Sequence, residues 1–216
     1  MRTDDATRQP DAAFLEPRAI NPKSAKDFDA AYTSSPVWDI GFPQPAFQAL
    51  ATAGAIRGRV VDVGCGTGEH ALMAAALGCE ATGVDLAQTG IALARAKALE
   101  RGLNVRFEVL DALQLPTLGE QFDTGLDSGL FHVLDPATRI EFAHALRAVM
   151  RTGGRYYILC FSDQQPGTWG PFRISQEEIR NTFHAGWAVE SIEPSRFQVR
   201  TLPGGAHAWL VRLFAQ

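Results

Sequence analysis

Short apolar runs alternate with amphipathic stretches from about residue 43 to the end of the chain. Apolar runs bounded by turn residues predict buried strands, and longer stretches with a period near 3.6 predict helices. Strands are expected at 59–63, 80–84, 105–110, 122–127, 156–161, 187–192 and 207–214. Helices are expected at 45–56, 68–77, 87–101 and 136–151, and from residue 175 onward.

Local signals support several of these helix ends. Asp135 is a natural N-cap before Pro136, and Ser175 with Glu178 three residues later forms a capping box. Gly102 and the Gly153-Gly154 pair are typical helix stops. The pattern therefore predicts discrete helices inserted between the strands.

Strands that alternate with helices indicate parallel βαβ units with right-handed crossovers. The last two strands are instead joined by the turn-like stretch 193–206, which predicts an antiparallel final strand. We expect an α/β, Rossmann-like, seven-stranded and mostly parallel sheet, with helices on both faces and an N-terminal helical arm. Residues 1–30 are polar and proline-containing, so they are expected to form a flexible arm before a single domain over 31–216.

The composition limits the class of protein. The chain has 216 residues, 46% hydrophobic and 20% charged, which is typical of one globular domain. A net charge of −4 without a basic run argues against nucleic acid as a partner. Three cysteines without a Cys-x-x-Cys pair argue against a disulfide framework or a metal site. No secretory h-region or 18-residue apolar stretch is present, so we expect a cytoplasmic protein with no membrane partner.

The first strand runs into the loop DVGCGTGE, with glycines at 64, 66 and 68. Glycines let a ligand approach the backbone closely, and the following helix offers free N–H donors. The spacing is G-x-G-x-G rather than the dinucleotide fingerprint G-x-G-x-x-G. Asp62 and Glu69 flank the loop with negative charge, which favours a ligand that carries an ammonium or sulfonium. A tight structural turn is the alternative interpretation.

Acidic residues end the next three predicted strands: Asp85, Asp111 and Asp127. An acid about 20 residues beyond such a loop typically holds ribose hydroxyls, and ligands bind at the carboxyl ends of parallel strands. Asp85 follows Asp62 by 23 residues. Asp111 or Asp127 taken alone would equally serve as a helix cap.

The stretch VVDVGCGTGEHALMAAALGCEATGVDLAQTGIALARAKA resembles class I S-adenosylmethionine-dependent methyltransferases, a resemblance that extends over about residues 32–216. The stretches PVWDIGFPQPAF, FDTGLDSGLFHVL and FHAGWAVESIEPSRF resemble a bacterial group near the thiopurine, thiol and tellurite methyltransferases. That group includes enzymes that methylate heterocyclic toxins or benzoquinone-like phenols. The resemblance implies S-adenosyl-L-methionine as cofactor and S-adenosylhomocysteine as product.

The resemblance also implies roles for individual residues around the cofactor. The methionine part would lie against the loop and the end of the fourth strand, at Asp62, Gly64, Cys65, Gly66, Gly68, Asp127 and Ser128. The nucleoside part would lie against Asp85 (ribose), Leu86, Asp111 (adenine amine) and Ala112. Trp38 would close over the cofactor from the N-terminal side, with a plain hydrophobic plug as its alternative role. Cys65 has acidic neighbours that oppose thiolate formation, so we interpret its side chain as a small packing group.

Fewer residues are candidates for binding the methyl acceptor. His132, just beyond the fourth strand, would act as a general base or would anchor the loop by hydrogen bonds. Phe131, Trp169 and Phe172 would wall an apolar acceptor pocket, the last two from a long loop over 162–174. Core packing is the alternative for each aromatic ring.

The sequence therefore predicts methyl transfer to an S, N or O atom of a small, aromatic or heterocyclic molecule by a monomer or homodimer. Three alternatives stay open. They are an NAD(P)-dependent oxidoreductase, a non-catalytic S-adenosylmethionine sensor, and a nucleic-acid or protein methyltransferase. The glycine spacing opposes the first, and the acidic charge balance opposes a nucleic-acid acceptor.

Overall fold

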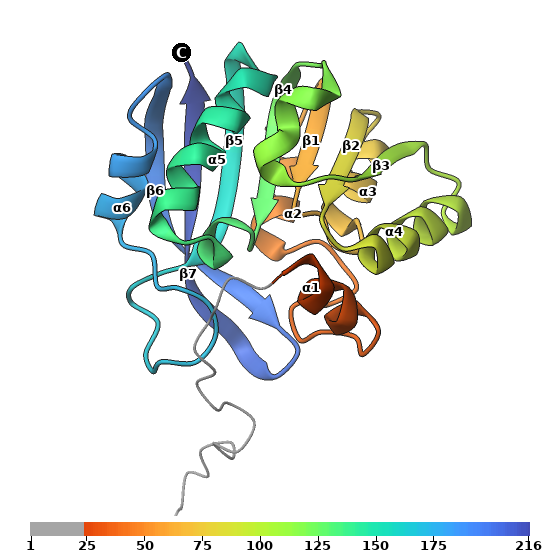
Figure 1. Ribbon diagram of the computed structural model, residues 1–216, viewed down its shortest axis with the longest axis horizontal. Coiled ribbons are helices and arrows are strands. Elements are labelled where there is room, and N and C mark those ends of the chain that lie inside the picture. The colour runs from red at the N-terminus through yellow and green to blue at the C-terminus, as the bar shows by residue number, and fades with distance from the viewer. Residues whose placement is uncertain (1–23) are drawn as a thin grey trace, which may run out of the picture.

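The computed structural model describes residues 24–216, and a single sheet runs through the middle of this part of the chain (Figure 1). The strand order is β3-β2-β1-β4-β5-β7-β6. The strands are β1 (Arg59–Val63), β2 (Glu80–Asp85), β3 (Val105–Val109), β4 (Phe122–Ser128), β5 (Met150–Phe161), β6 (Trp187–Val199) and β7 (Leu202–Ala215). Strand β7 pairs antiparallel with both β5 and β6, while the pairs from β3 to β5 are parallel. The predicted Rossmann-like sheet with an antiparallel last strand is confirmed.

Helices cover both faces of the sheet. They are α1 (Ala25–Tyr32), α2 (Pro45–Thr52), α3 (Glu69–Ala76), α4 (Gln88–Glu100), α5 (Pro136–Val149) and α6 (Gln176–Thr182), with 3-10 turns η2 (Ala112–Leu118) and η3 (Phe131–Val133). Asp135 accepts from the N–H groups of Ala137 and Thr138, and Ser175 and Glu178 bond reciprocally. The caps expected at the starts of α5 and α6 are therefore present.

The hydrophobic core has a part on each side of the sheet. Beneath α5 and α6, Phe142, Leu146 and Ile158 are fully buried. On the other side, α2 buries Phe47 against residues that include Leu159 of β5. Fully burying side chains of this size contributes about 1.5–3 kcal/mol each. The central strands are thus apolar on both faces, which leaves their carboxyl ends as the place for polar side chains.

The β6–β7 connection differs from the sequence expectation. Residues 193–206 were predicted to be turn-like, yet β6 continues to Val199 and β7 begins at Leu202. Pro194 is compatible with β6 because this strand lies at the edge of the sheet, where a missing N–H is tolerated. The long β6–β7 hairpin therefore projects past the carboxyl ends of the parallel strands (Figure 1).

The region around α1 also differs from the sequence expectation. Residues 25–30 fall within the predicted flexible arm but form helix α1, while residues 1–23 lie outside the described residues. Asp29 accepts the backbone N–H of Thr89 at 2.6 Å, which ties α1 to the start of α4. Tyr32 at the end of α1 is only 9% exposed. Helix α1 is therefore packed onto the domain.

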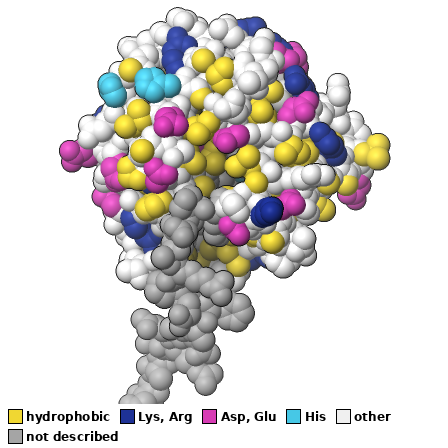
Figure 2. All heavy atoms as spheres, in the orientation of Figure 1, with side chains coloured by type: hydrophobic (Ala, Val, Ile, Leu, Met, Phe, Trp, Pro, Cys, Tyr) yellow, Lys and Arg dark blue, Asp and Glu magenta, His cyan; other side chains and the backbone are white. Residues whose placement is uncertain are grey.

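Two further features concern the surface charge and the character of the helices. Lysine and arginine side chains are interspersed with aspartate and glutamate on the face shown in Figure 2. Within residues 24–216, every helix is too short or too polar to cross a lipid bilayer.

Candidate cofactor and acceptor site

Parallel strands bring the predicted site residues to one edge of the sheet. Strand β1 lies between β2 and β4, with Asp62 level with Gly83 of β2 and with Leu126 of β4. The glycine loop, Asp85 and Asp127 therefore follow three neighbouring strands. Asp111 joins them two residues beyond β3.

The three loop glycines adopt left-handed backbone conformations, with φ of 70° at Gly64, 53° at Gly66 and 84° at Gly68. A Cβ atom at Gly68 would lie 2.7 Å from the Phe107 ring, and one at Gly64 would lie 2.9 Å from Leu130. A Cβ atom at Gly66 would collide with the Tyr32 hydroxyl. Close packing against protein side chains thus explains why residues 64 and 68 are glycines. Gly66 instead lies against the Tyr32 hydroxyl.

Asp62 holds the start of α3 and leaves one oxygen free. Its Oδ2 accepts the N–H of Ala71 at 3.1 Å, while its buried Oδ1 has no partner in the described part of the chain. Burial raises the pKa of Asp62 to about 8, and the charges of Asp127 and Asp85 add to the rise. A buried, unpartnered carboxyl oxygen in a negative field suits a cationic group.

Glu69 does not present its charge to a ligand, contrary to the sequence expectation. Lys97 lies 2.8 Å from Oε1, and Arg101 donates to both oxygens of Glu69 at 2.8 and 2.9 Å. Burial opposes ionisation of Glu69, but the hydrogen bonds from Arg101 and Lys97 outweigh it and lower its pKa. The cause was invisible in the sequence, because both cations lie about 30 residues away on α4.

Asp85 organises the neighbouring turn with both oxygens. Oδ2 accepts the N–H of Gly66 and Oδ1 accepts that of Ala87, each at 2.8 Å. Burial raises the pKa of Asp85, and these two N–H groups only partly offset the rise. Leu86 beside it is 38% exposed, while Asp85 itself is half-buried. Asp85 and Leu86 therefore offer a polar and an apolar contact side by side.

Asp111 and Asp127 each accept backbone N–H groups of the turn that follows them. Asp111 accepts the N–H of Leu113 at 2.9 Å, and Ala112 behind it is buried. Asp127 is fully buried and accepts the N–H groups of Leu130 and Phe131. Burial raises the pKa of Asp127 to about 7, against the effect of these hydrogen bonds. Asp127 thus shapes the turn after β4, at which Ser128 is half-buried.

Tyr32 is a site residue that sequence reasoning missed. Its hydroxyl lies over Gly66 and accepts from Nε1 of Trp38 at 3.4 Å. Burial and the charge of Asp85 raise the pKa of Tyr32 well above its usual value. Asp39 accepts the Thr67 hydroxyl at 3.1 Å, which ties the segment after α1 to the glycine loop. The available signal was Tyr32 six residues before Trp38, at the end of a short amphipathic stretch.

Gln44 fixes the same segment from the other side. Its side chain bonds both the N–H and the C=O of Gln198 in β6, at 2.8 and 2.9 Å. Its own N–H donates to Nε2 of His70 at 3.1 Å, and burial lowers the pKa of His70 to about 4. Gln44 is 2% exposed, so it is an anchor and not only a helix cap. Residues 33–44 thereby connect the glycine loop with the β6–β7 hairpin.

His132 has the geometry of a loop anchor and donor. The N–H of Phe161 donates to Nδ1 of His132 at 2.9 Å, so a neutral ring carries its proton on Nε2. Burial lowers the pKa of His132 to about 3, and the nearby charges of Arg139 and Arg173 lower it further. A general base needs a free ring nitrogen and a pKa near the working pH. The observed geometry favours the second of the two predicted roles, the hydrogen-bonded anchor.

The aromatic residues of the predicted acceptor wall divide into two groups. Phe131 is fully buried against Phe183 in the core, which favours core packing, the alternative role named for it above. Trp169 and Phe172 are half-buried on the 162–174 loop. Trp169 packs edge-on against Phe161 with ring centroids 5.7 Å apart. These two side chains keep the exposure that an acceptor wall requires.

Arg173 holds this loop in place, and sequence reasoning did not single it out. Its guanidinium donates to the carbonyl groups of Gln165, Trp169 and Pro171 at 3.2, 2.6 and 2.9 Å. It also lies over the rings of Phe161 and Trp169, 5.3 and 5.5 Å from their centroids. One planar cation thus sets the course of a 13-residue loop whose ends are Ser162 and Ile174, which form a β-bridge.

These residues fit S-adenosylmethionine. The unpartnered Oδ1 of Asp62 and the negative field of Asp62, Asp85 and Asp127 suit a ligand with an ammonium and a sulfonium. Exposed Leu86 and buried Ala112 offer apolar surface for an adenine ring. The Cys65 thiol is buried, and burial with the charges of Asp62 and Asp85 raises its pKa well above the usual value, as a packing role requires.

Comparison with known proteins agrees with this chemistry. Residues 60–154 match the family described as "Methyltransferase domain". A 2-heptyl-1-hydroxyquinolin-4(1H)-one methyltransferase from Mycobacteroides abscessus is 37% identical over 164 residues, which cover 74% of this chain and 72% of that protein. A ubiquinone biosynthesis O-methyltransferase from Roseobacter denitrificans is 28% identical, and the match covers 79% of this chain but only 56% of that protein.

Solved structures give the same result. A protein studied for the conversion of a disulfide bond into a thioacetal group in echinomycin biosynthesis is 38% identical, with a TM-score of 0.82 and coverage of 90% of this chain and 92% of that one. The magnesium protoporphyrin IX methyltransferase from Synechocystis, with bound S-adenosylmethionine, shares the fold at 18% identity, a TM-score of 0.62 and coverage of 79% and 76%. The chain belongs to the class I S-adenosylmethionine-dependent methyltransferases, with S-adenosylmethionine as its cofactor and S-adenosylhomocysteine as its product.

Proposed function

We propose that this protein methylates the ionised oxygen of a small aromatic heterocycle, such as a hydroxyquinolone. The observation that carries the proposal is the hydrogen bond from the N–H of Phe161 to Nδ1 of His132. It leaves Nε2–H of His132 as a donor, so the side chain stabilises an anionic acceptor and does not remove a proton from a neutral one. The acceptor would therefore arrive already ionised.

The aromatic side chains near His132 support a flat acceptor. His132, Phe161 and Phe197 pack with ring centroids 5.0–5.5 Å apart, and Trp169 joins them through Phe161. Such rings favour offset or edge-on contact with another ring. The most similar relatives reported above support the class, since one methylates a hydroxyquinolone and another is an O-methyltransferase of ubiquinone biosynthesis.

S-adenosylmethionine supplies a methyl group on a cationic sulfur, and the acceptor oxygen displaces that sulfur in a single step. The protein contributes position and exclusion of water. We propose that Asp62 binds the ammonium, that Asp85 binds the ribose hydroxyls, and that Leu86 and Ala112 enclose the adenine. Gly64, Cys65, Gly66, Gly68, Asp111, Asp127 and Ser128 would complete the cofactor site, and Trp38 would cover it together with Tyr32.

A thiolate acceptor is the second candidate. It also needs no protein base, and the solved relative with a TM-score of 0.82 comes from work on sulfur chemistry. Either candidate acceptor is a small molecule. For both, we propose a cytoplasmic protein that acts as a monomer or a homodimer.

The test is transfer of labelled methyl from S-adenosylmethionine to a matched set of acceptors. The set would hold 2-heptyl-1-hydroxyquinolin-4(1H)-one, 4-hydroxyquinoline, phenol, thiophenol and an alkyl thiol. Asp85→Ala is the control that weakens cofactor binding. The proposal predicts faster turnover of the acidic hydroxyquinolone than of phenol, with the gap closing as pH approaches the pKa of phenol. Faster turnover of thiols would favour the sulfur candidate, and equal turnover of neutral phenol at pH 6 would contradict both.

A further inference from the structure

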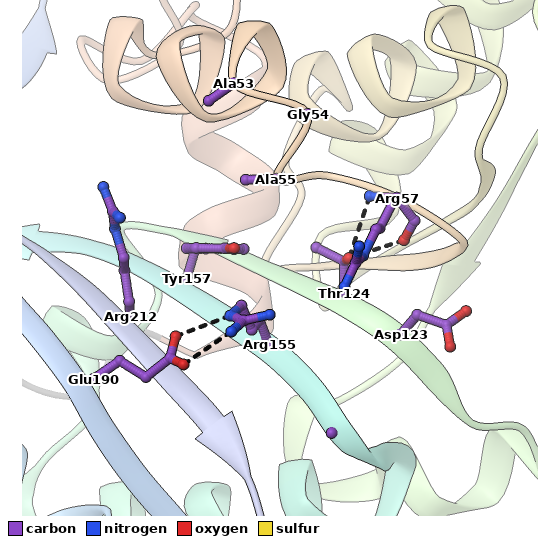
Figure 3. Close-up of a pocket in the computed structure, with 11 residues that line it drawn as sticks. Ala53, Gly54, Ala55, Arg57, Asp123, Thr124, Arg155, Tyr157, Glu190 and Arg212 are labelled. Carbon is purple, nitrogen blue, oxygen red and sulfur yellow. Dashed lines mark hydrogen bonds and ion pairs between the residues drawn. The ribbon is translucent and has the colours of Figure 1, made fainter.

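A pocket of about 380 Å³ lies away from the cofactor and acceptor site. Its floor is formed by Thr124 near the start of β4, by Tyr157 in β5 and by Arg212 near the end of β7. Its rim is the segment from Ala53 to Arg57, between α2 and β1 (Figure 3). Thr124 and its partner Arg155 lie toward the amino ends of the parallel strands, while Tyr157 is level with Leu126 in mid-sheet. None of the residues that line the pocket belongs to the proposed cofactor or acceptor residues.

Three arginines line this pocket. Arg155 is bound by both oxygens of Glu190, at 2.9 and 3.0 Å, so its charge is balanced. Arg57 is exposed, and its guanidinium forms no ion pair with any described acidic side chain. Asp123 also lines the pocket, but its carboxylate accepts from Arg151 and from the N–H of Arg59. The pocket therefore holds more positive charge than its own carboxylates neutralise.

Arg212 adds an unsatisfied donor. Its Nε is buried and has no hydrogen-bond partner in the described residues, while Nη2 lies 3.7 Å from Glu193. Ser191, its neighbour across β6 and β7, also has a buried hydroxyl without a partner. An unpaired buried donor destabilises the fold, so a site that retains one is a candidate for an external acceptor.

Tyr157 lies between these cations. It is cross-strand partner to Arg212, and Figure 3 shows its ring between Arg212 on one side and Thr124 with Arg57 on the other. Burial raises the pKa of the Tyr157 hydroxyl, and the charges of Arg155, Arg212 and Arg57 oppose that rise. Glu190 acts in the opposite sense to the arginines. Tyr157 is 2% exposed, and it lines the pocket as a second polar side chain beside Arg212.

We propose that this pocket is a second binding site that takes a small organic anion, a carboxylate or a phosphate ester, through Arg57, Arg212 and the Tyr157 hydroxyl. A planar guanidinium presents the paired donors that both anions accept. The volume is sufficient for a ligand the size of a substituted benzene ring.

The test is calorimetric titration of the full chain, saturated with S-adenosylhomocysteine, with benzoate, phenyl phosphate and the uncharged benzyl alcohol. The variants are Arg57→Gln, Arg212→Gln and Tyr157→Phe. Arg180→Gln, at an exposed arginine of α6, is the matched control. Thermal unfolding of each variant checks that it is folded.

At least one anion is expected to bind while benzyl alcohol does not. Arg57→Gln and Arg212→Gln should weaken binding about tenfold or more, since each removes a charged hydrogen-bond donor. The better anion identifies the source, a carboxylate or a phosphate. The proposal is overturned if neither anion binds at millimolar concentration, or if Arg57→Gln binds as tightly as Arg180→Gln. If Arg212→Gln does not fold, exposed Arg57 still decides the result.

Discussion

The backbone N–H of Phe161 donates to Nδ1 of His132 at 2.9 Å, and this contact joins the end of β5 to the turn η3 that follows β4. It fixes the tautomer of the imidazole and leaves Nε2–H as the group that can meet an acceptor. The pKa of His132 is lowered to about 3, chiefly by burial, so the ring stays neutral over the working pH range.

The pH dependence of methyl transfer should therefore show no step from His132 between pH 5 and 8. With cofactor at saturation, any step in that range should follow the acceptor's own ionisation instead. His132→Asn should reduce kcat/KM, because the shorter amide side chain no longer places its donor and its acceptor where the imidazole does, while the shape of the profile stays the same. The unsubstituted protein could instead lose activity below pH 6.5. If that loss disappears in His132→Asn, His132 acts as a general base.

Asp85→Ala should weaken S-adenosylhomocysteine binding by about 1–3 kcal/mol, the usual cost of losing a charged hydrogen-bond partner. Titration calorimetry measures this directly. The change also releases the N–H groups of Gly66 and Ala87, so Asp85→Asn is the matched variant that retains an acceptor. Unchanged affinity in both variants would remove Asp85 from the site.

Asp62 should make cofactor binding depend on pH. Its pKa in the ligand-free protein is raised to about 8, and an ammonium pairs only with the ionised form. Binding should then release a proton below pH 8, and affinity should rise with pH up to that value, by at most tenfold per unit. Calorimetry in buffers of different ionisation enthalpy reports the proton. Asp62→Asn should abolish this dependence, and its persistence in the variant would exclude Asp62 as the cause.

The same shift has a consequence for stability. A carboxyl whose folded pKa is raised binds its proton more tightly in the folded state, so the ligand-free protein loses stability as pH rises from about 4 to 8. Asp62→Asn should flatten this slope in chemical unfolding experiments. A steeper slope in the variant would contradict the assignment.

Glu69→Gln should destabilise the fold by about 1–3 kcal/mol at pH 7, because Lys97 and Arg101 lose a buried partner. For a chain of this size, that is a fall in Tm of roughly 2–10 °C. Since the lowered pKa of Glu69 contributes stability above its unfolded value, the difference from the parent should shrink as pH falls below about 4. Glu177→Gln, at an exposed residue of α6, is the control.

Arg173→Lys should raise the KM for the acceptor with a smaller effect on cofactor affinity. Lysine keeps the charge but cannot donate to several carbonyl groups at once or stack on Phe161 and Trp169. Steady-state kinetics with both substrates varied separates the two effects. An equal loss of affinity for cofactor and acceptor would indicate general destabilisation instead of loop positioning.

The strands, most helix bounds and the edge of the sheet at which the candidate site residues gather could be predicted from the sequence alone. Alternating hydrophobic runs, the caps at Asp135 and Ser175, and acids at the ends of successive strands are local features, and parallel strands bring them to one edge by necessity. The extent of β6 and β7 was missed, because an edge position and a long partner strand overrode the turn-forming residues Pro194 and Gly204-Gly205.

The partners of each charged or polar side chain became evident from the three-dimensional fold. Glu69 is neutralised by cations on α4, His132 is fixed by the backbone of β5, and the Tyr32 hydroxyl lies over Gly66. The anion pocket likewise joins Arg57 and Arg212, which are far apart in the chain. Local pattern specifies where a strand ends, whereas burial, protonation and pairing depend on neighbours that the fold brings together from distant parts of the sequence.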